Sequence, residues 1–129
     1  MAKGRSGIGI HVGKMDFYKY YLGFIKPIHP INKLKNKQLE VLAVLMYERA
    51  EIESKISDPS LIPKLLLSSE VKEKILKQFH LSSSNYYGII SCLKRMKVIV
   101  DNDLSKKVIP EVVDGKFVLT VSFTVEDET

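Results

Sequence analysis

The apolar residues follow a helical period through the middle of the chain and a two-residue period near its C-terminal end. Apolar positions recur at i, i+3, i+4 and i+7 in three stretches, which predicts helices over residues 37–55, 69–79 and 83–97. Asn36 is the expected N-cap of the first helix, and Ser68 or Ser69 that of the second. The turn His80–Ser83 joins the last two helices, so they form a closely spaced pair.

A common core follows from the inward faces of these helices. Each helix has charged residues on the side opposite its apolar stripe, as a helix on the surface of a globular protein has. The residues expected to be buried together are Leu42, Ile75, Ile89, Leu93 and Phe117.

β-structure is predicted after the third helix. The β-branched run Val98–Val100 indicates a strand, and the polar turn Asp101–Asp103 follows it. Asp114–Gly115 is typical of a tight hairpin turn, because both residues tolerate positive φ. Phe117, Leu119, Val121, Phe123 and Val125 alternate with Val118, Thr120, Ser122 and Thr124, so the two sets point to opposite faces of a strand over 116–125. This predicts an antiparallel ribbon that turns at Asp114–Gly115, between residues 108–113 and 116–125.

The N-terminal residues 1–35 are expected to form a basic arm ahead of a domain spanning residues 36–129. Up to Lys37 the chain has eight basic residues and one acid, whereas the remainder has 12 basic and 14 acidic residues. Such a charge asymmetry suits contact with nucleic acid or an acidic partner, and it also suits a solvated tail. Within the arm, a short helix over 16–25 would place four aromatic residues on one stripe, where core packing is favoured over stacking on bases: Phe17, Tyr20, Tyr21 and Phe24.

This order of elements resembles the winged helix-turn-helix superfamily. The stretches Leu81–Tyr86 and Leu93–Ile99 are similar to the recognition-helix signature of MarR-type regulators and of phage and plasmid replication initiators. Such proteins usually have glycine where this chain has Lys97, and MarR proteins dimerise through terminal helices that are not expected after Val125. The resemblance implies an α+β, mainly α fold, namely a winged helix-turn-helix domain with a C-terminal β-hairpin and an extended N-terminal arm.

The resemblance further implies a non-enzymatic protein that binds double-stranded DNA, as a transcriptional regulator or a replication-associated protein. Short polar side chains at the start of the third helix suit base edges, and basic ones near its end suit phosphates. The DNA-binding residues implied are Ser84, Asn85, Tyr87, Ser91, Lys94, Arg95, Lys106 and Lys107.

A structural or packaged phage virion protein is the alternative, because winged helices also serve as protein-interaction modules. The N-terminal arm would then contact other virion subunits or copies of this chain. The cytoplasm is the expected compartment for a regulator and the virion for the alternative. No membrane partner is expected, since no apolar run approaches the roughly 20 residues of a transmembrane helix.

Enzymatic chemistry is not expected. The three histidines are scattered without metal-ligand spacing, and Cys92, the single cysteine, lies within a predicted helix beside Leu93. The glycines around Lys14 lack the spacing of a phosphate-binding loop. Neither a metal nor a cofactor is therefore predicted.

Overall fold

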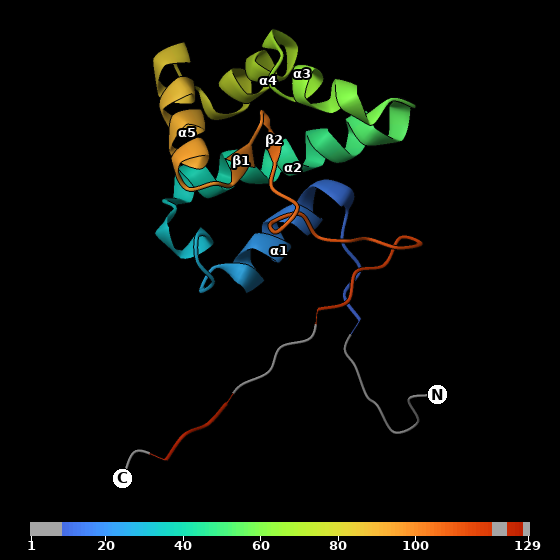
Figure 1. Ribbon diagram of the computed structural model, residues 1–129, viewed down its shortest axis with the longest axis vertical. Helices are drawn as coiled ribbons and strands as arrows, with labels where there is room; N and C mark the ends of the chain where they lie inside the picture. Colours follow the sequence, from blue (N-terminus) through green and yellow to red (C-terminus); the bar gives the residue numbers. More distant parts are fainter. Residues whose placement is uncertain (1–8, 120–123, 128–129) are drawn as a thin grey trace.

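The structure is a computed structural model that describes residues 9–119 and 124–127. These residues form five α-helices and one two-stranded antiparallel sheet, so the fold is mainly helical with a small β-component. Short 3-10 helices lie at Ile31–Lys33 and Pro59–Leu61. The remaining elements are α1 (Lys14–Ile25), α2 (Asn36–Lys55), α3 (Ile62–Leu66), α4 (Ser69–Phe79), α5 (Ser83–Arg95), β1 (Ile99–Val100) and β2 (Asp103–Leu104) (Figure 1).

The three predicted helices are confirmed as α2, α4 and α5. Ser68 caps α4, because its Oγ accepts a hydrogen bond from the Val71 N–H at 3.4 Å. The cap of α2 was predicted one residue too late: Lys35 occupies it, and its backbone N–H donates to Gln38 Oε1 at 2.8 Å. Asn36 is therefore the first residue of the helix instead of its cap.

Helix α2 lies at the centre of the molecule and packs against α1, α3, α4 and α5 (Figure 1). Of the predicted core, Leu42, Ile75, Ile89 and Leu93 are buried. Phe117 is only half-buried and packs against the edge of the same hydrophobic cluster, beside α1. Its ring lies edge-on to the rings of Phe17 and Tyr21 in α1, with centroids 5.5 and 5.4 Å apart.

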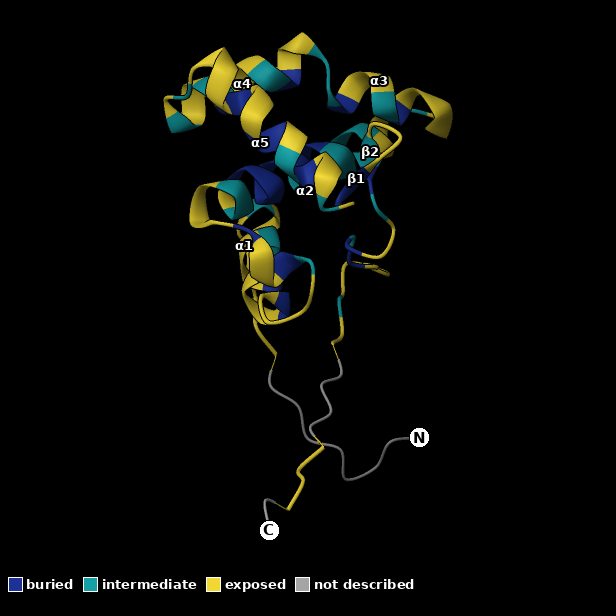
Figure 2. Cartoon of the chain, turned by 60° about the vertical axis from the view of Figure 1, so that its left-hand side comes forward, coloured by how far each residue is buried: buried dark blue, intermediate teal, exposed yellow. Residues whose placement is uncertain are grey.

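Helix α1 confirms the short helix predicted near residues 16–25, but only Phe17 and Tyr21 of its predicted aromatic stripe pack against the core. Tyr21, Leu22 and Ile25 are buried, whereas Tyr20 and Phe24 are 55% and 59% exposed. Figure 2 shows the exposed outer side of α1. The inner side of α1 shares a hydrophobic cluster with α2, whereas residues 9–13, ahead of the helix, form neither helix nor strand.

The strand pairing differs from the prediction. β1 confirms the strand at Val98–Val100, and it pairs with β2 through a turn in which Asp101 and Asn102 have φ of 54° and 62°. The turn at Asp114–Gly115 is present, but it carries a single bridge between Val113 and Lys116. The predicted strands are wrong for residues 108–112, 117–119 and 124–125, which have no strand structure, while residues 120–123 lie outside the described ranges.

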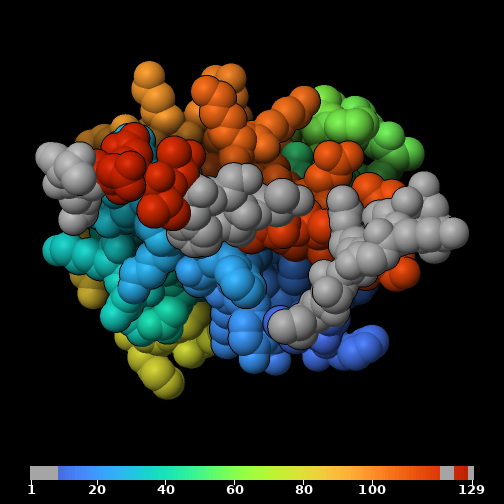
Figure 3. Space-filling view, turned by 90° about the horizontal axis from the view of Figure 1, so that it is seen from below, coloured from blue at the N-terminus to red at the C-terminus, as the bar shows by residue number. Residues whose placement is uncertain are grey.

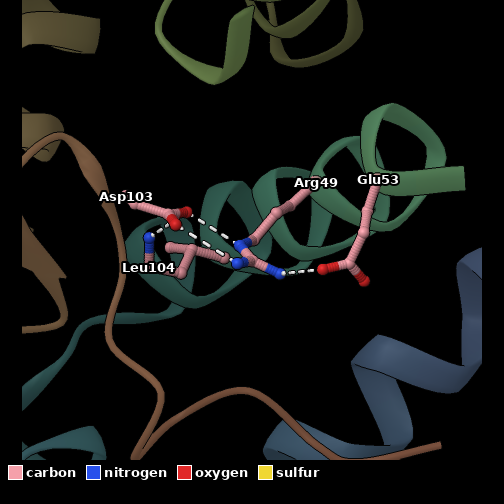
Figure 4. Close-up of polar contacts among 4 residues, drawn as sticks. All are labelled: Arg49, Glu53, Asp103 and Leu104. Carbon is pink, nitrogen blue, oxygen red and sulfur yellow. Dashed lines mark hydrogen bonds and ion pairs between the residues drawn. The ribbon is translucent and has the colours of Figure 1, made fainter. Parts of the chain in front are cut away.

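An ion pair fastens the β1–β2 hairpin to α2 (Figure 4). Arg49 donates from Nε to Asp103 Oδ1 at 2.7 Å and from Nη2 to Asp103 Oδ2 at 3.2 Å. Its Nη1 reaches the exposed Glu53 at 3.4 Å. The hydrogen bond to Asp103 raises the pKa of the Arg49 guanidinium above its ordinary value. The hairpin is therefore held at its β2 end by a two-pronged, partly buried contact.

Of the helices in the described ranges, none has the length and hydropathy of a membrane-spanning segment.

Candidate nucleic-acid interface

Helices α4 and α5 are joined by a tight turn, pack against one another and both contact α2 (Figure 1). His80 ends α4 in the left-handed conformation, with φ of 53°, and the Leu81 N–H donates back to the Leu76 carbonyl at 3.0 Å. Ser82 then caps α5, accepting a hydrogen bond from the Asn85 N–H at 3.1 Å. This geometry fixes where α5 starts and which of its faces turns inward.

The inward face of α5 is apolar, and its outward face carries short polar and basic side chains. Its buried residues are Tyr86, Ile89, Ile90 and Leu93. Ser84, Tyr87, Ser91, Lys94 and Arg95 lie on the opposite side at helical spacing, and all five are exposed. Asn85 is also exposed and lies at the edge of this face, in the first turn. Because α5 contains no acidic residue, the whole outward face is neutral or basic.

Gly88 lies in the middle of the outward face of α5. A Cβ built at this glycine would meet no atom within 4 Å, so packing inside the protein does not require it. Glycine in a helix interior costs roughly 0.5–1 kcal/mol relative to alanine. Its presence leaves a shallow, open centre in the outward face, suited to close approach by another molecule.

Lys106 and Lys107 follow β2, whose partner strand β1 comes shortly after α5 in the chain. The Ser105 N–H donates to the Val98 carbonyl at 2.8 Å, which extends the hairpin pairing by one residue towards α5. Both lysines are exposed. Lys94 and Arg95 in the last turn of α5, taken together with Lys106 and Lys107 after the hairpin, are here called the basic end of α5.

The hairpin turn itself is not basic. Asp101 and Asn102 form its tip, and both are exposed. An aspartate repels phosphates, so the positive charge lies at the base of the hairpin, at Lys106 and Lys107, instead of at its tip.

One contact within the candidate interface was missed by the sequence analysis. Lys72 of α4 lies 5.0 Å from the ring centroid of Tyr87 and donates from Nζ to the Tyr87 hydroxyl at 3.2 Å. The sequence indicated that each residue faces outward, but only the packing of α4 against α5 shows that the two meet. Lys72 therefore fixes the position of an exposed aromatic ring on the candidate DNA-binding face.

The C-terminal end of α5 adopts a Schellman motif centred on Lys97. The Lys97 N–H donates to the Lys94 carbonyl at 3.1 Å and the Val98 N–H to the Leu93 carbonyl at 2.9 Å. Lys97 itself has φ of 60°, a left-handed conformation that side chains with a Cβ disfavour. The position at which winged-helix proteins usually have glycine is thus one where this chain's backbone favours glycine.

Replacing Lys97 by glycine is expected to stabilise the protein by about 0.5–1 kcal/mol, because the steric cost of the left-handed conformation disappears. Urea denaturation would measure the change in the free energy of unfolding. Lys97→Ala is the matched control, since it removes the same charge but keeps the Cβ, and it should give no stabilisation. Equal gains for both variants would show that charge, and not backbone conformation, limits stability at this position.

The described residues contain no group of three or more His, Cys, Asp or Glu side chains that could hold a metal ion. Cys92 is half-buried within α5. The three histidines are exposed and lie on different parts of the fold.

Comparison with known proteins gives no match: no protein-family model, curated protein or solved structure is significantly similar to this chain.

Proposed function

We propose that the protein binds double-stranded DNA and that residues 36–107 form a winged helix-turn-helix unit whose recognition helix is α5. The order of α2, α4, α5 and the β1–β2 hairpin supports this topology. In the proposed complex, α5 enters the major groove with Ser84, Asn85, Tyr87 and Ser91 towards the base edges. The basic end of α5 then lies against the phosphates.

The outward face of α5 is the observation that carries the proposal. It combines exposed short polar groups, an open centre at Gly88 and positive charge at one end, without any acidic side chain. A face built for packing against the rest of the protein would be apolar, as the opposite face of α5 is. A helix of this kind fits the major groove, which admits one α-helix and presents hydrogen-bonding edges.

The affinity test uses fluorescence anisotropy with random-sequence duplex DNA at several salt concentrations. The fourfold variant Lys94→Gln, Arg95→Gln, Lys106→Gln and Lys107→Gln should bind more weakly. For each phosphate contact that the variant loses, the plot of log affinity against log salt concentration should become less steep by about 0.9. The matched control replaces exposed lysines away from α5, Lys55→Gln and Lys64→Gln, and should retain at least most of the affinity.

The specificity test uses a sequence selected from a random duplex library. Asn85→Ala should weaken binding to the selected sequence by roughly 1–3 kcal/mol and leave binding to random DNA almost unchanged. Contacts to base edges determine sequence specificity, whereas contacts to phosphates only position the protein on the duplex. If the isolated chain shows no salt-sensitive DNA binding, the proposal fails. The use of this fold for contacts with virion subunits would then be the better explanation of the exposed face of α5.

A further inference from the structure

The outer face of α1 exposes large apolar side chains that the fold does not use. Tyr20 and Phe24 are 55% and 59% exposed, and Ile28, just beyond the helix, is 59% exposed. Single exposed apolar residues are common on protein surfaces, but a group on one side of one helix marks an interaction surface. Figure 3 looks onto the underside of the molecule, where part of the blue surface of α1 is visible.

The spacing along this face is that of a helix-packing seam. Asp16, Tyr20 and Gly23 follow one another at intervals of four and three residues, which keeps them on one line along α1, and Pro27 lies four residues further, just beyond the helix. A Cβ built at Gly23 would meet no atom within 4 Å. Gly23 also lines a groove of about 330 Å³ between α1 and the start of α2, so the surface is hollow beside the middle of the seam.

The charges at the two ends of the seam are opposite. Asp16 lies in the first turn of α1 and Lys26 directly follows its last residue. Neither forms an ion pair with another described residue. A second copy of α1 running antiparallel, centred between Tyr20 and Gly23, places Asp16 of each copy beside Lys26 of the other. The same arrangement places each Tyr20 ring over the hollow at Gly23 of the other copy.

We infer that α1 is a self-association surface through which two copies of this chain pair antiparallel about a two-fold axis. A surface used in this way must be complementary to itself, and the seam meets that condition twice, in shape and in charge. Helix α1 packs on a different side of α2 from α5 (Figure 1). Pairing therefore leaves the candidate DNA-binding face open, and the inference does not depend on the proposed function.

Sedimentation equilibrium of the full chain, followed up to about 0.5 mM, tests the pairing. A seam formed by one twelve-residue helix is small, so the wild type should dimerise with a Kd on the order of 1–100 µM. Phe24→Ser and Tyr20→Ser should each raise that Kd by about tenfold or more. Val118→Ser, at a residue 81% exposed and outside α1, is the matched control and should leave the Kd unchanged.

A charge exchange tests the antiparallel orientation. Asp16→Lys and Lys26→Asp should each weaken the dimer, because each places like charges side by side, and the double variant should recover most of the loss. Circular dichroism of each variant shows that the helical content is retained. A wild type that stays monomeric throughout would overturn the inference. So would a dimer insensitive to Tyr20→Ser and Phe24→Ser, or a monomer that uses these aromatics to bind single-stranded oligonucleotides.

Discussion

Leu93→Ala is expected to destabilise the protein by about 2–5 kcal/mol, the usual range when a buried leucine is truncated in a close-packed core. Leu93 is fully buried on the inward face of α5. Its carbonyl also accepts the hydrogen bond that closes the helix end, so the backbone around it is fixed and has little freedom to collapse into the cavity. Chemical denaturation followed by circular dichroism would measure the free energy of unfolding.

Ser91→Ala is the appropriate comparison, because it changes the exposed face of the same helix two residues away. It should alter stability by no more than about 0.5 kcal/mol. A loss below about 1 kcal/mol for Leu93→Ala would mean that α5 is rotated relative to the described structure. In that case the assignment of Ser84 and Ser91 to the outward face would also fail.

Asp103→Ala is expected to cost about 1.5–3 kcal/mol, the range for hydrogen bonds to charged groups. The variant removes both contacts from Arg49 and leaves that guanidinium, whose side chain is only 12% exposed, without its main partner. Asp103 Oδ1 also accepts the Leu104 N–H at 2.7 Å, so a backbone donor in the hairpin loses its acceptor as well. Thermal or urea denaturation would measure the loss.

Glu53→Ala provides the control, since Glu53 contacts the same guanidinium from a side chain that is 63% exposed. Exposed ion pairs contribute little, so this variant should cost less than about 0.5 kcal/mol. A double-mutant cycle between Arg49→Ala and Asp103→Ala isolates the pairwise contribution. Equal costs for Asp103→Ala and Glu53→Ala would show that the hairpin is not anchored by the Arg49–Asp103 pair.

The sequence correctly predicted the helices in which the capping residue and the apolar period indicate the same segment. Ser68 and Ser82 cap α4 and α5, and the apolar stripe of each helix is continuous and narrow. Helix α1 lacks that agreement, because aromatic residues occupy both of its sides. Which aromatics turn inward is decided by contact with α2 and residue 117, and a local period cannot contain that information.

Strand pairing, like the orientation of the α1 aromatics, depends on residues that are distant in the sequence. Alternation over 116–125 indicates a preference for extended structure, but pairing requires a partner strand at a matching register, which depends on distant residues. For the β1–β2 hairpin, the sequence predicted the first strand and the polar turn but not the second strand. The exposed residues that α5 contributes to the candidate site could be predicted from the helical period, whereas the contact between Lys72 and Tyr87 depends on how α4 packs against α5.

The Tyr21 hydroxyl donates a hydrogen bond to the Val108 carbonyl at 2.6 Å, which joins α1 to a segment 87 residues later in the chain. Only the neutral phenol can donate this hydrogen bond, and burial raises the pKa of Tyr21 above its ordinary value of 10.0. The contribution of this contact is therefore complete below pH 10 and disappears as the pH rises through the folded-state pKa. In strongly alkaline solution the phenolate would face a carbonyl oxygen, so the contact between α1 and residue 108 should be lost.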